Sequence, residues 1–334
     1  MPRIIYQGRV HEARAGQTVL DVLLEGGEPI AHACRVGACG ACIVRATEGQ
    51  PPAQAQVGLR DAWRAQGYFH ACRAEVSGDL VVEPLGEGAR VAAQIEERAA
   101  LSPTVARVFV RLLGELPATA GQYVTLHRGH TARSYSIAAL PAPGILELHV
   151  RRVPGGALSP YLCDDAAPGD PLLVQGPLGH CIYVPGRPED PLLLAGTGTG
   201  LAPLWGVLHD ALSANHRGPI YLFHGALTPG DLYLVEELRQ LAATHPGLRY
   251  VPSAVRAEPD SRSMSAAPPE LELGPLDEVI ARHLPSTSGM RAFLCGAPEI
   301  VALLKRKLYL AGTSLRDIAA DAFVPTAPPA ASTR

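Results

Sequence analysis

Lysine is almost missing from this chain of 334 residues, and aromatic side chains make up only 5% of it. Lys305 and Lys307 are its only lysines, and its 29 lysine and arginine residues are outnumbered by 32 aspartate and glutamate residues. Proteins that bind nucleic acids usually carry a basic excess. The charge balance therefore predicts no nucleic-acid partner.

Long apolar segments are also scarce. The uncharged run 191–208 approaches the length of a membrane span, but it contains G-T-G-T-G and a proline. These residues favour a buried strand, a loop and a helix over a span. The first ten residues lack the apolar core of a signal peptide. We therefore expect no membrane partner.

The chain has seven cysteines, an odd number. Secreted disulfide scaffolds are shorter and richer in cysteine, so we expect thiols in a reducing compartment, the cytoplasm, with some of them bound to metal. Three cysteines crowd into nine residues, Cys34, Cys39 and Cys42, and three others stand alone: Cys163, Cys181 and Cys295.

The pattern of apolar residues changes twice along the chain. Short strands and helices come first, with Thr18 as a candidate cap of a helix, and the sequence predicts a β-grasp unit. Almost continuous strand patterns follow, which predict a six-stranded antiparallel β-barrel. Strands then alternate with helices, near 276–284 and 298–310 among others, as in a parallel α/β sheet. The expected divisions are a first domain (1–88), a barrel domain (94–187), an α/β domain (188–324) and a disordered tail (325–334).

The spacing C-x4-C-x2-C, followed by Cys72 about thirty residues later, is that of a plant-type [2Fe–2S] cluster. Gly37 and Gly40 allow the loop to fold tightly around such a cluster and to aim amide N–H groups at its sulfurs. The alternative is a structural zinc site with four thiolates, which normally uses paired C-x2-C units. The predicted metal ligands are Cys34, Cys39, Cys42 and Cys72.

The barrel region contains R-S-Y-S, residues 133–136. An arginine beside an aromatic ring and a hydroxyl can hold a phosphate, cover a flat ring and bond a ring nitrogen. Alternation places Arg133 and Tyr135 on one face of the strand and Ser134 and Ser136 on the other. A plain surface strand would explain these four residues equally well. The glycine turn 155–159 nevertheless offers backbone N–H groups to a pyrophosphate.

A second glycine loop, A-G-T-G-T-G-L-A-P, follows an apolar strand and opens a helix. That context is typical of a diphosphate-binding turn, although the motif is not the standard dinucleotide fingerprint. No lysine or arginine stands between His224 and Arg239 to hold a 2′-phosphate, which favours NADH over NADPH. Asp231 is interpreted as a helix cap. Cys295, in C-G-A-P, is a candidate neighbour of the nicotinamide or an inert core residue.

With these motifs in this order, the chain resembles the NADH-dependent iron–sulfur flavoprotein reductases of multicomponent oxygenases, of the ring-hydroxylating dioxygenase and phenol- or toluene-monooxygenase types. The resemblance implies a plant-type ferredoxin domain joined to a ferredoxin–NADP reductase-like module. It implies FAD, although FMN stays an alternative. The insert at 258–272 departs from the family pattern and is expected to be mobile, and Leu227 stands where relatives often carry a basic residue.

The resemblance also implies roles for individual residues. It implies FAD contacts for one set: Arg133, Tyr135, Ser136, His149, Val150, Gly156 and Ser159. It implies contacts to the nicotinamide dinucleotide for another: Gly196, Thr197, Gly198, Thr199, Gly200, Cys295 and Gly296. Phe323 would cover the free face of the flavin. Ser136, Cys295 and Phe323 would position the reacting rings and would not act as nucleophiles.

NADH gives up two electrons together as hydride, whereas a [2Fe–2S] cluster accepts one, and a flavin can mediate between them. We therefore expect electrons to pass from NADH through FAD and the cluster to an oxygenase component or a separate ferredoxin. Three alternatives stay open. The first is a reductase for a non-oxygenase acceptor such as a deoxysugar dehydratase. The others are a non-catalytic flavin/iron–sulfur electron-transfer or sensory module and a zinc-stabilised structural protein.

Overall fold

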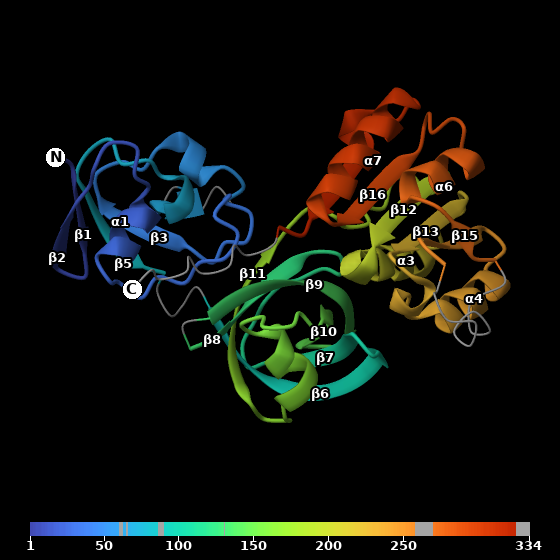
Figure 1. Ribbon diagram of the computed structural model, residues 1–334, viewed down its shortest axis with the longest axis horizontal. Helices are drawn as coiled ribbons and strands as arrows, with labels where there is room; N and C mark the ends of the chain where they lie inside the picture. The colour runs from blue at the N-terminus through green and yellow to red at the C-terminus, as the bar shows by residue number, and fades with distance from the viewer. Residues whose placement is uncertain (60–62, 65, 86–89, 130, 258–269, 325–334) are drawn as a thin grey trace.

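The computed structural model describes residues 1–334 except 60–62, 65, 86–89, 130, 258–269 and 325–334. The predicted tail and most of the predicted insert lie outside the described residues. Three sheets follow one another along the chain, and Figure 1 shows the first beside the barrel and the third on the barrel's other side. No helix among the described residues is long and apolar enough to cross a membrane.

The first sheet has the order β2-β1-β5-β3-β4, in which β1 and β5 run parallel and the other pairs antiparallel. Thr18 caps the helix of this unit, as the sequence predicted, and also forms a reciprocal capping box with Asp21. Leu23 of that helix and Phe69 belong to the same apolar core. Its elements are β1 (Arg3–Tyr6), β2 (Arg9–Glu12), α1 (Val19–Glu25), β3 (Ile43–Glu48), η1 (Ala53–Gln56), β4 (Tyr68–His70), η2 (Ala71–Arg73) and β5 (Leu80–Pro84).

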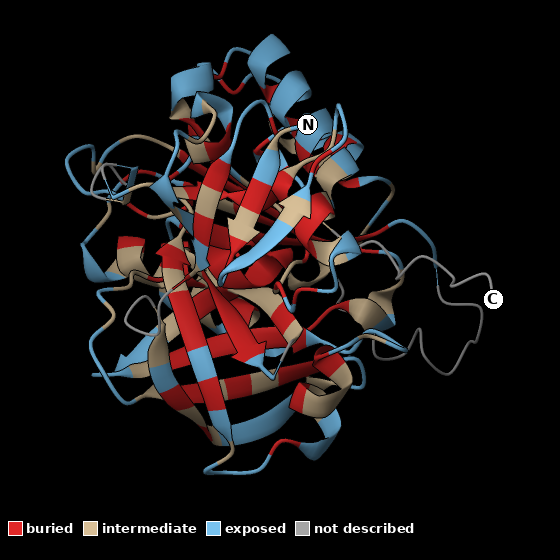
Figure 2. Cartoon of the chain, turned by 90° about the vertical axis from the view of Figure 1, so that its left-hand side faces the viewer, coloured by how far each residue is buried: buried red, intermediate tan, exposed pale blue. Residues whose placement is uncertain are grey.

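The second sheet closes into a barrel in the order β10-β7-β6-β11-β8-β9, with antiparallel pairing between neighbouring strands. The predicted six-stranded barrel is therefore confirmed. Apolar side chains such as Leu126, Ile137 and Leu148 fill its core, and Figure 2 shows buried positions along the strands. Its elements are β6 (Val91–Ser102), β7 (Val105–Leu112), β8 (Tyr123–Arg128), β9 (Thr131–Ala142), β10 (Ile145–Arg151), η4 (Tyr161–Asp165) and β11 (Pro171–Leu178).

The third sheet is parallel throughout, in the order β15-β14-β13-β12-β16-β17. The helices predicted near 276–284 and 298–310 are present as α6 and α7. The strands are β12 (Leu192–Thr197), β13 (Ile220–Ala226), β14 (Leu248–Ala254), β15 (Glu272–Leu273), β16 (Arg291–Gly296) and β17 (Ile318–Ala322). The helices are η5 (Gly198–Gly200), α3 (Leu201–Ser213), η6 (Pro229–Asp231), α4 (Val235–Thr244), α6 (Leu276–His283), α7 (Pro298–Leu310) and η7 (Leu315–Asp317).

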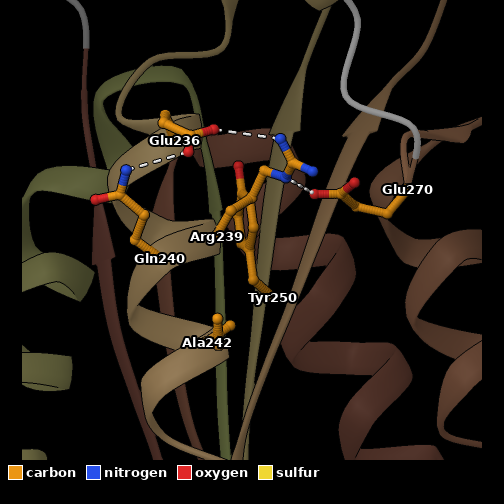
Figure 3. Close-up of a pocket in the computed structure, with 7 residues that line it drawn as sticks. Glu236, Arg239, Gln240, Ala242, Tyr250 and Glu270 are labelled. Atoms are coloured by element: carbon orange, nitrogen blue, oxygen red, sulfur yellow. Dashed lines mark hydrogen bonds and ion pairs between the residues drawn. The ribbon is translucent and has the colours of Figure 1, made fainter.

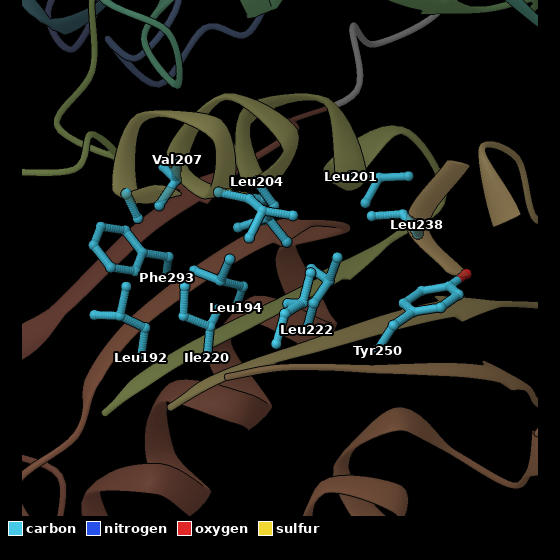
Figure 4. Packing of buried hydrophobic residues seen from close by; sticks show 14 of the residues in the cluster. Leu192, Leu194, Leu201, Leu204, Val207, Ile220, Leu222, Leu238, Tyr250 and Phe293 are labelled. Carbon is cyan, nitrogen blue, oxygen red and sulfur yellow. The ribbon is translucent and has the colours of Figure 1, made fainter. Parts of the chain in front are cut away.

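Two apolar cores hold the helices against this sheet. Figure 4 shows Leu204 and Val207 of α3 packed over Leu194 and Phe293 of the sheet. A second core, under α6 and α7, covers the opposite face. Because α3 also packs against β9, the α/β unit rests directly on the barrel. The carboxyl ends of the parallel strands are where ligands bind in open α/β sheets.

Candidate functional site

The four predicted cluster cysteines form two pairs. The Cys34 thiol interacts with that of Cys39, and the Cys42 thiol with that of Cys72. Pairing of β3 with β4 brings the segment of Cys72 to that of Cys42. There the Ala71 N–H donates to the Cys42 carbonyl at 3.0 Å. Among the described residues, no three His, Cys, Asp or Glu side chains are arranged to hold a single metal ion. Two pairs of thiolates match the four cysteine ligands of a [2Fe–2S] cluster.

The loop around these cysteines favours anionic sulfur. The Cys34 sulfur accepts the backbone N–H groups of Val36 at 3.5 Å and Cys39 at 3.4 Å. The Cys39 thiol and these N–H groups lower the pKa of Cys34. Gly40 has φ +69°, and a Cβ there would lie 2.8 Å from the Leu178 side chain. The residues present therefore fit a thiolate-bound cluster held close to the barrel.

Barrel side chains bind the backbone of this loop directly. Thr125 donates to the Cys39 carbonyl at 2.6 Å, and Gln175 donates to the Gly40 carbonyl at 2.7 Å. Ser134 also reaches the Cys39 carbonyl, at 3.4 Å, and the Tyr123 hydroxyl donates to that of Ala38. Thr125 and Gln175 are fully buried. The sequence analysis missed these residues, because a threonine or glutamine within a strand carries no signal for such a contact.

The R-S-Y-S segment lies on β9 and alternates as predicted. Ser134 pairs with Thr125 of β8 on the side that meets the cysteine loop, whereas Tyr135 packs against the barrel core. Arg133 donates to the Ala132 carbonyl at 2.7 Å. Ser136 is buried, and its hydroxyl donates to Asp321 at 3.4 Å. One strand thus faces the cysteine loop and carries the proposed flavin contacts.

The other residues of the predicted FAD set lie on β10 and in the turn that follows. His149 and Val150 are both buried. The His149 ring lies between the Glu147 carboxylate, at 3.0 Å, and the Tyr233 hydroxyl, at 3.2 Å. Its side chain therefore joins the barrel to the α/β unit. Ser159 accepts the Val153 N–H at 3.1 Å, which closes the turn that contains Gly156.

The loop Gly196–Gly200 begins where β12 ends, and η5 leads into α3. A Cβ on Gly200 would lie only 2.3 Å from the Cys295 carbonyl oxygen, so this position requires glycine. Gly196 and Cys295 are partners in the parallel register of β12 and β16. The Thr197 hydroxyl accepts the Ala297 N–H at 3.4 Å. The two predicted nucleotide loops therefore contact each other at the carboxyl edge of the sheet.

Asp321 lies at the centre of the site, and the sequence analysis did not identify it. It pairs with Cys295 in the register of β16 and β17 and receives the hydrogen bond from Ser136. Burial raises the pKa of Asp321 to about 6. Phe323 is partly buried, and its N–H donates to the Gly296 carbonyl at 2.8 Å. The flavin strand and the nucleotide loops are thus connected through Asp321.

Two predictions near the nucleotide loop need revision. Asp231 does not cap α4: its carboxylate accepts the Thr228 N–H at 3.1 Å and closes the short turn η6. The prediction of NADH rests on the absence of lysine and arginine between His224 and Arg239. Outside that segment, the backbone N–H of the exposed Arg256 donates to the Leu227 carbonyl at 3.0 Å, so a cationic residue also lies at this edge.

A surface pocket between α4 and β14 belongs to a different part of the molecule. Figure 3 shows Arg239 there between Glu236 and Glu270, at 3.2 and 2.8 Å. None of the predicted site residues lines this pocket. Its polar groups satisfy one another, so it adds nothing to the site.

Three family models match the chain in the order of its sheets. A 2Fe-2S iron-sulfur cluster binding domain matches residues 4–77, and an oxidoreductase FAD-binding domain matches residues 92–183. An oxidoreductase NAD-binding domain matches residues 194–306. Binding sites for a [2Fe–2S] cluster, FAD and NAD therefore occur in one chain.

Similar proteins include reductase components of oxygenase systems. The chain is 33% identical to the ferredoxin–NAD(P)+ reductase component of the naphthalene 1,2-dioxygenase system of Pseudomonas putida, covering 95% of this chain and 96% of that protein. It is also 33% identical to the reductase subunit of an aromatic O-demethylase from an Amycolatopsis strain, covering 95% and 97%.

Solved structures agree with these similarities. An Amycolatopsis cytochrome P450 reductase matches with a TM-score of 0.68 and 30% identity, covering 98% of this chain and all of that one. The ferredoxin reductase in carbazole 1,9a-dioxygenase, at 23% identity, shares the fold with a TM-score of 0.64 over 96% and 98% of the two chains. The chain belongs to the iron–sulfur flavoprotein reductases of oxygenase systems.

Proposed function

We propose that the chain takes hydride from NADH onto FAD and passes single electrons through the [2Fe–2S] cluster to an oxygenase component or to its ferredoxin. One observation carries this proposal. β9 carries Ser134, which bonds the Cys39 carbonyl, and Ser136, which bonds Asp321 beside Cys295. A single strand thus connects the cysteine loop, the flavin motif and the nucleotide loops.

The residue assignments are part of the proposal. The thiolates of Cys34 and Cys39 would bind one iron, and those of Cys42 and Cys72 the other. Arg133, Tyr135 and Ser136 would hold the FAD. Four further residues would also contact the FAD: His149, Val150, Gly156 and Ser159. The nicotinamide dinucleotide would contact another set: Gly196, Thr197, Gly198, Thr199, Gly200 and Gly296. Cys295 and Ser136 would align the two rings, with Phe323 over the flavin.

The proposed path of electrons from the flavin to the cluster runs along β9. The Ser134 side contacts the cluster loop, and the neighbouring residues Arg133 and Tyr135 belong to the flavin motif. Neighbouring residues of one strand would therefore hold the flavin and contact the cluster loop while that loop lies on the barrel. FAD supplies the conversion between two-electron and one-electron transfer when it is bound.

The proposal also includes a preference for NADH over NADPH. Leu227 at the end of β13 offers no charge to a 2′-phosphate, which supports NADH. Arg256 lies beside Leu227 and could neutralise such a phosphate. We therefore propose that NADH is the main donor and that Arg256 permits measurable use of NADPH.

The acceptor and location are also proposals. Relatives serve a naphthalene dioxygenase system and an aromatic O-demethylase, so similarity indicates an oxygenase without selecting one. All seven cysteines are free thiols, which supports a reducing cytoplasm. The proposed domain limits are 1–88 for the ferredoxin domain, 94–187 for the FAD domain and 188–324 for the NAD domain, with 325–334 as a tail.

Rapid mixing of the purified holoprotein with NADH tests this function. The flavin band should bleach first and the cluster should be reduced next, and cytochrome c should then be reduced in steady state. Cys72→Ser should keep NADH-dependent flavin bleaching but lose the cluster and cytochrome c reduction. Cys163→Ser, a matched change in η4 that removes no proposed cluster ligand, should behave as the native chain. A protein that lacks flavin, or whose flavin NADH does not bleach, would contradict the proposal.

A further inference from the structure

Two cysteines outside the cluster lie against each other beside the nucleotide loops. The sulfur atoms of Cys181 and Cys295 are 3.3 Å apart, and the residues are 1% and 2% exposed. Cys181 follows β11 of the barrel, whereas Cys295 is in β16 of the α/β unit. The function proposed above gives Cys181 no task.

The surroundings connect this pair to the reacting site. Cys295 is the register partner of Asp321, which Ser136 contacts, and its carbonyl lies against Gly200 of the dinucleotide loop. Both cysteines belong to the apolar core beneath α3. A covalent bond between the sulfurs would therefore tie the segment after the barrel to the carboxyl edge of the parallel sheet.

We propose that Cys181 and Cys295 are a redox modification site, a dithiol that hydrogen peroxide converts to a disulfide that blocks reduction by NADH. The proposal rests on the proposed function, in which Cys295 borders the nicotinamide. A disulfide holds its sulfurs about 2.05 Å apart, so the two atoms need to approach by only about 1.2 Å.

The reaction balances with peroxide as the oxidant. One thiol attacks a peroxide oxygen, the O–O bond breaks, and a sulfenic acid and one water form. The second thiol then attacks the sulfenic sulfur, an S–S bond forms, and a second water leaves. Two electrons pass from the sulfurs to the peroxide. Reduced flavin that meets O2 generates hydrogen peroxide, so the oxidant arises where electron flow to the acceptor fails.

The bond would act on the positioning of the nicotinamide. Its formation draws the Cys295 side chain toward Cys181, at the residue whose carbonyl lies against Gly200 of the dinucleotide loop. It also fixes the segment after β11, which contains Cys181, to β16. Hydride transfer should therefore slow sharply, whereas the cluster, whose four proposed ligands do not include Cys181 or Cys295, should keep its ligands.

The test uses the FAD- and cluster-containing protein. Samples are exposed to graded hydrogen peroxide, quenched with catalase and assayed for NADH-dependent ferricyanide reduction. Free thiols are then alkylated, and an unreduced digest is examined by mass spectrometry. We expect activity to fall at least tenfold in proportion to a Cys181–Cys295 cross-linked peptide, and dithiothreitol to restore it. Iron content and the cluster spectrum report separately on cluster damage.

Cys181→Ala is the deciding variant, because it removes one sulfur and leaves Cys295 in place. It should keep basal activity and resist the peroxide that inactivates the native protein, whereas Cys163→Ala should remain sensitive. Equal inactivation of Cys181→Ala, or inactivation of the native protein without the cross-linked peptide, overturns the proposal. If Cys181→Ala does not fold, the peptide from the native chain decides alone. Failure of NADH to bleach untreated protein would instead overturn the proposed function.

Discussion

Replacing Thr125 by valine and Gln175 by leucine should slow the arrival of electrons at the cluster and leave flavin reduction unchanged. The two side chains donate to the Cys39 and Gly40 carbonyls at 2.6 and 2.7 Å. Both changes approximate the original shape but remove the donor. They therefore weaken the contact between the cysteine loop and the barrel without replacing a cysteine or a residue of the flavin motif.

The size of the effect follows from the two lost hydrogen bonds. Each bond contributes about 1 kcal/mol, and a buried carbonyl left without a partner costs about 1–3 kcal/mol. A loss of about 2 kcal/mol for the pair changes the ratio of docked to undocked molecules by roughly thirtyfold. Gln175 also bonds His127 at 2.9 Å, and Thr125 also bonds Ser134 at 3.0 Å, so each change removes one hydrogen bond within the barrel as well. Thr125→Val alone keeps both Gln175 contacts and should have a smaller effect.

Rapid mixing with NADH distinguishes the two steps, because the flavin and the cluster absorb differently. Flavin bleaching should keep its native rate, whereas cluster reduction and steady-state cytochrome c reduction should fall in the order native, Thr125→Val, double variant. Thr104→Val, a matched change in the exposed turn between β6 and β7, serves as the control. Native cluster reduction in the double variant, or an equal fall in flavin bleaching, would refute the reasoning.

Three further predictions concern the nucleotide side of the site. Burial raises the pKa of Asp321 to about 6, so this carboxyl is neutral below that pH and charged above it. NAD+, whose nicotinamide ring is positively charged, should therefore bind roughly tenfold more weakly at pH 5 than at pH 8, and Asp321→Asn should remove this dependence in a spectral titration. Phe323→Ala should alter NAD+ affinity and the flavin spectrum, and native values for both would show that Phe323 is misplaced. Arg256→Ala should lower kcat/KM for NADPH at least fivefold and leave that for NADH unchanged, whereas equal losses would indicate a general binding role.

Much of the fold could be predicted because its signals are local. Thr18 and Asp21 specify a helix start within four residues, and the pattern of 298–310 specifies α7 with both of its ends. The cysteine spacing identifies a cluster loop, because the bonding of four thiolates to two irons constrains a short segment. In each case the interacting residues are close in sequence or follow a simple period.

The residues that sequence reasoning missed owe their position to pairing between distant segments. Asp321 reaches Ser136 across 185 positions because β17 pairs with β16 at the edge of the sheet. Cys181 meets Cys295 across 114 positions. Arg256 reaches Leu227 only because β14 pairs with β13. The sequence around a single aspartate, cysteine or arginine contains no pattern that predicts a contact with a residue so far away in the chain.

The two sides of the cysteine loop differ in their exposure to solvent, and this difference indicates where electrons would leave the cluster. Cys39 is buried against the barrel, where Thr125 holds its carbonyl. On the other side Cys34 is partly exposed, Val36 is 51% exposed, and Arg35 bonds Asp21 at 3.0 Å. We therefore expect electrons that enter beside Cys39 to leave past Cys34 to an acceptor while the loop stays on the barrel. A single docked arrangement is sufficient for both transfers, so strengthening the loop–barrel contact should not slow turnover with the natural acceptor.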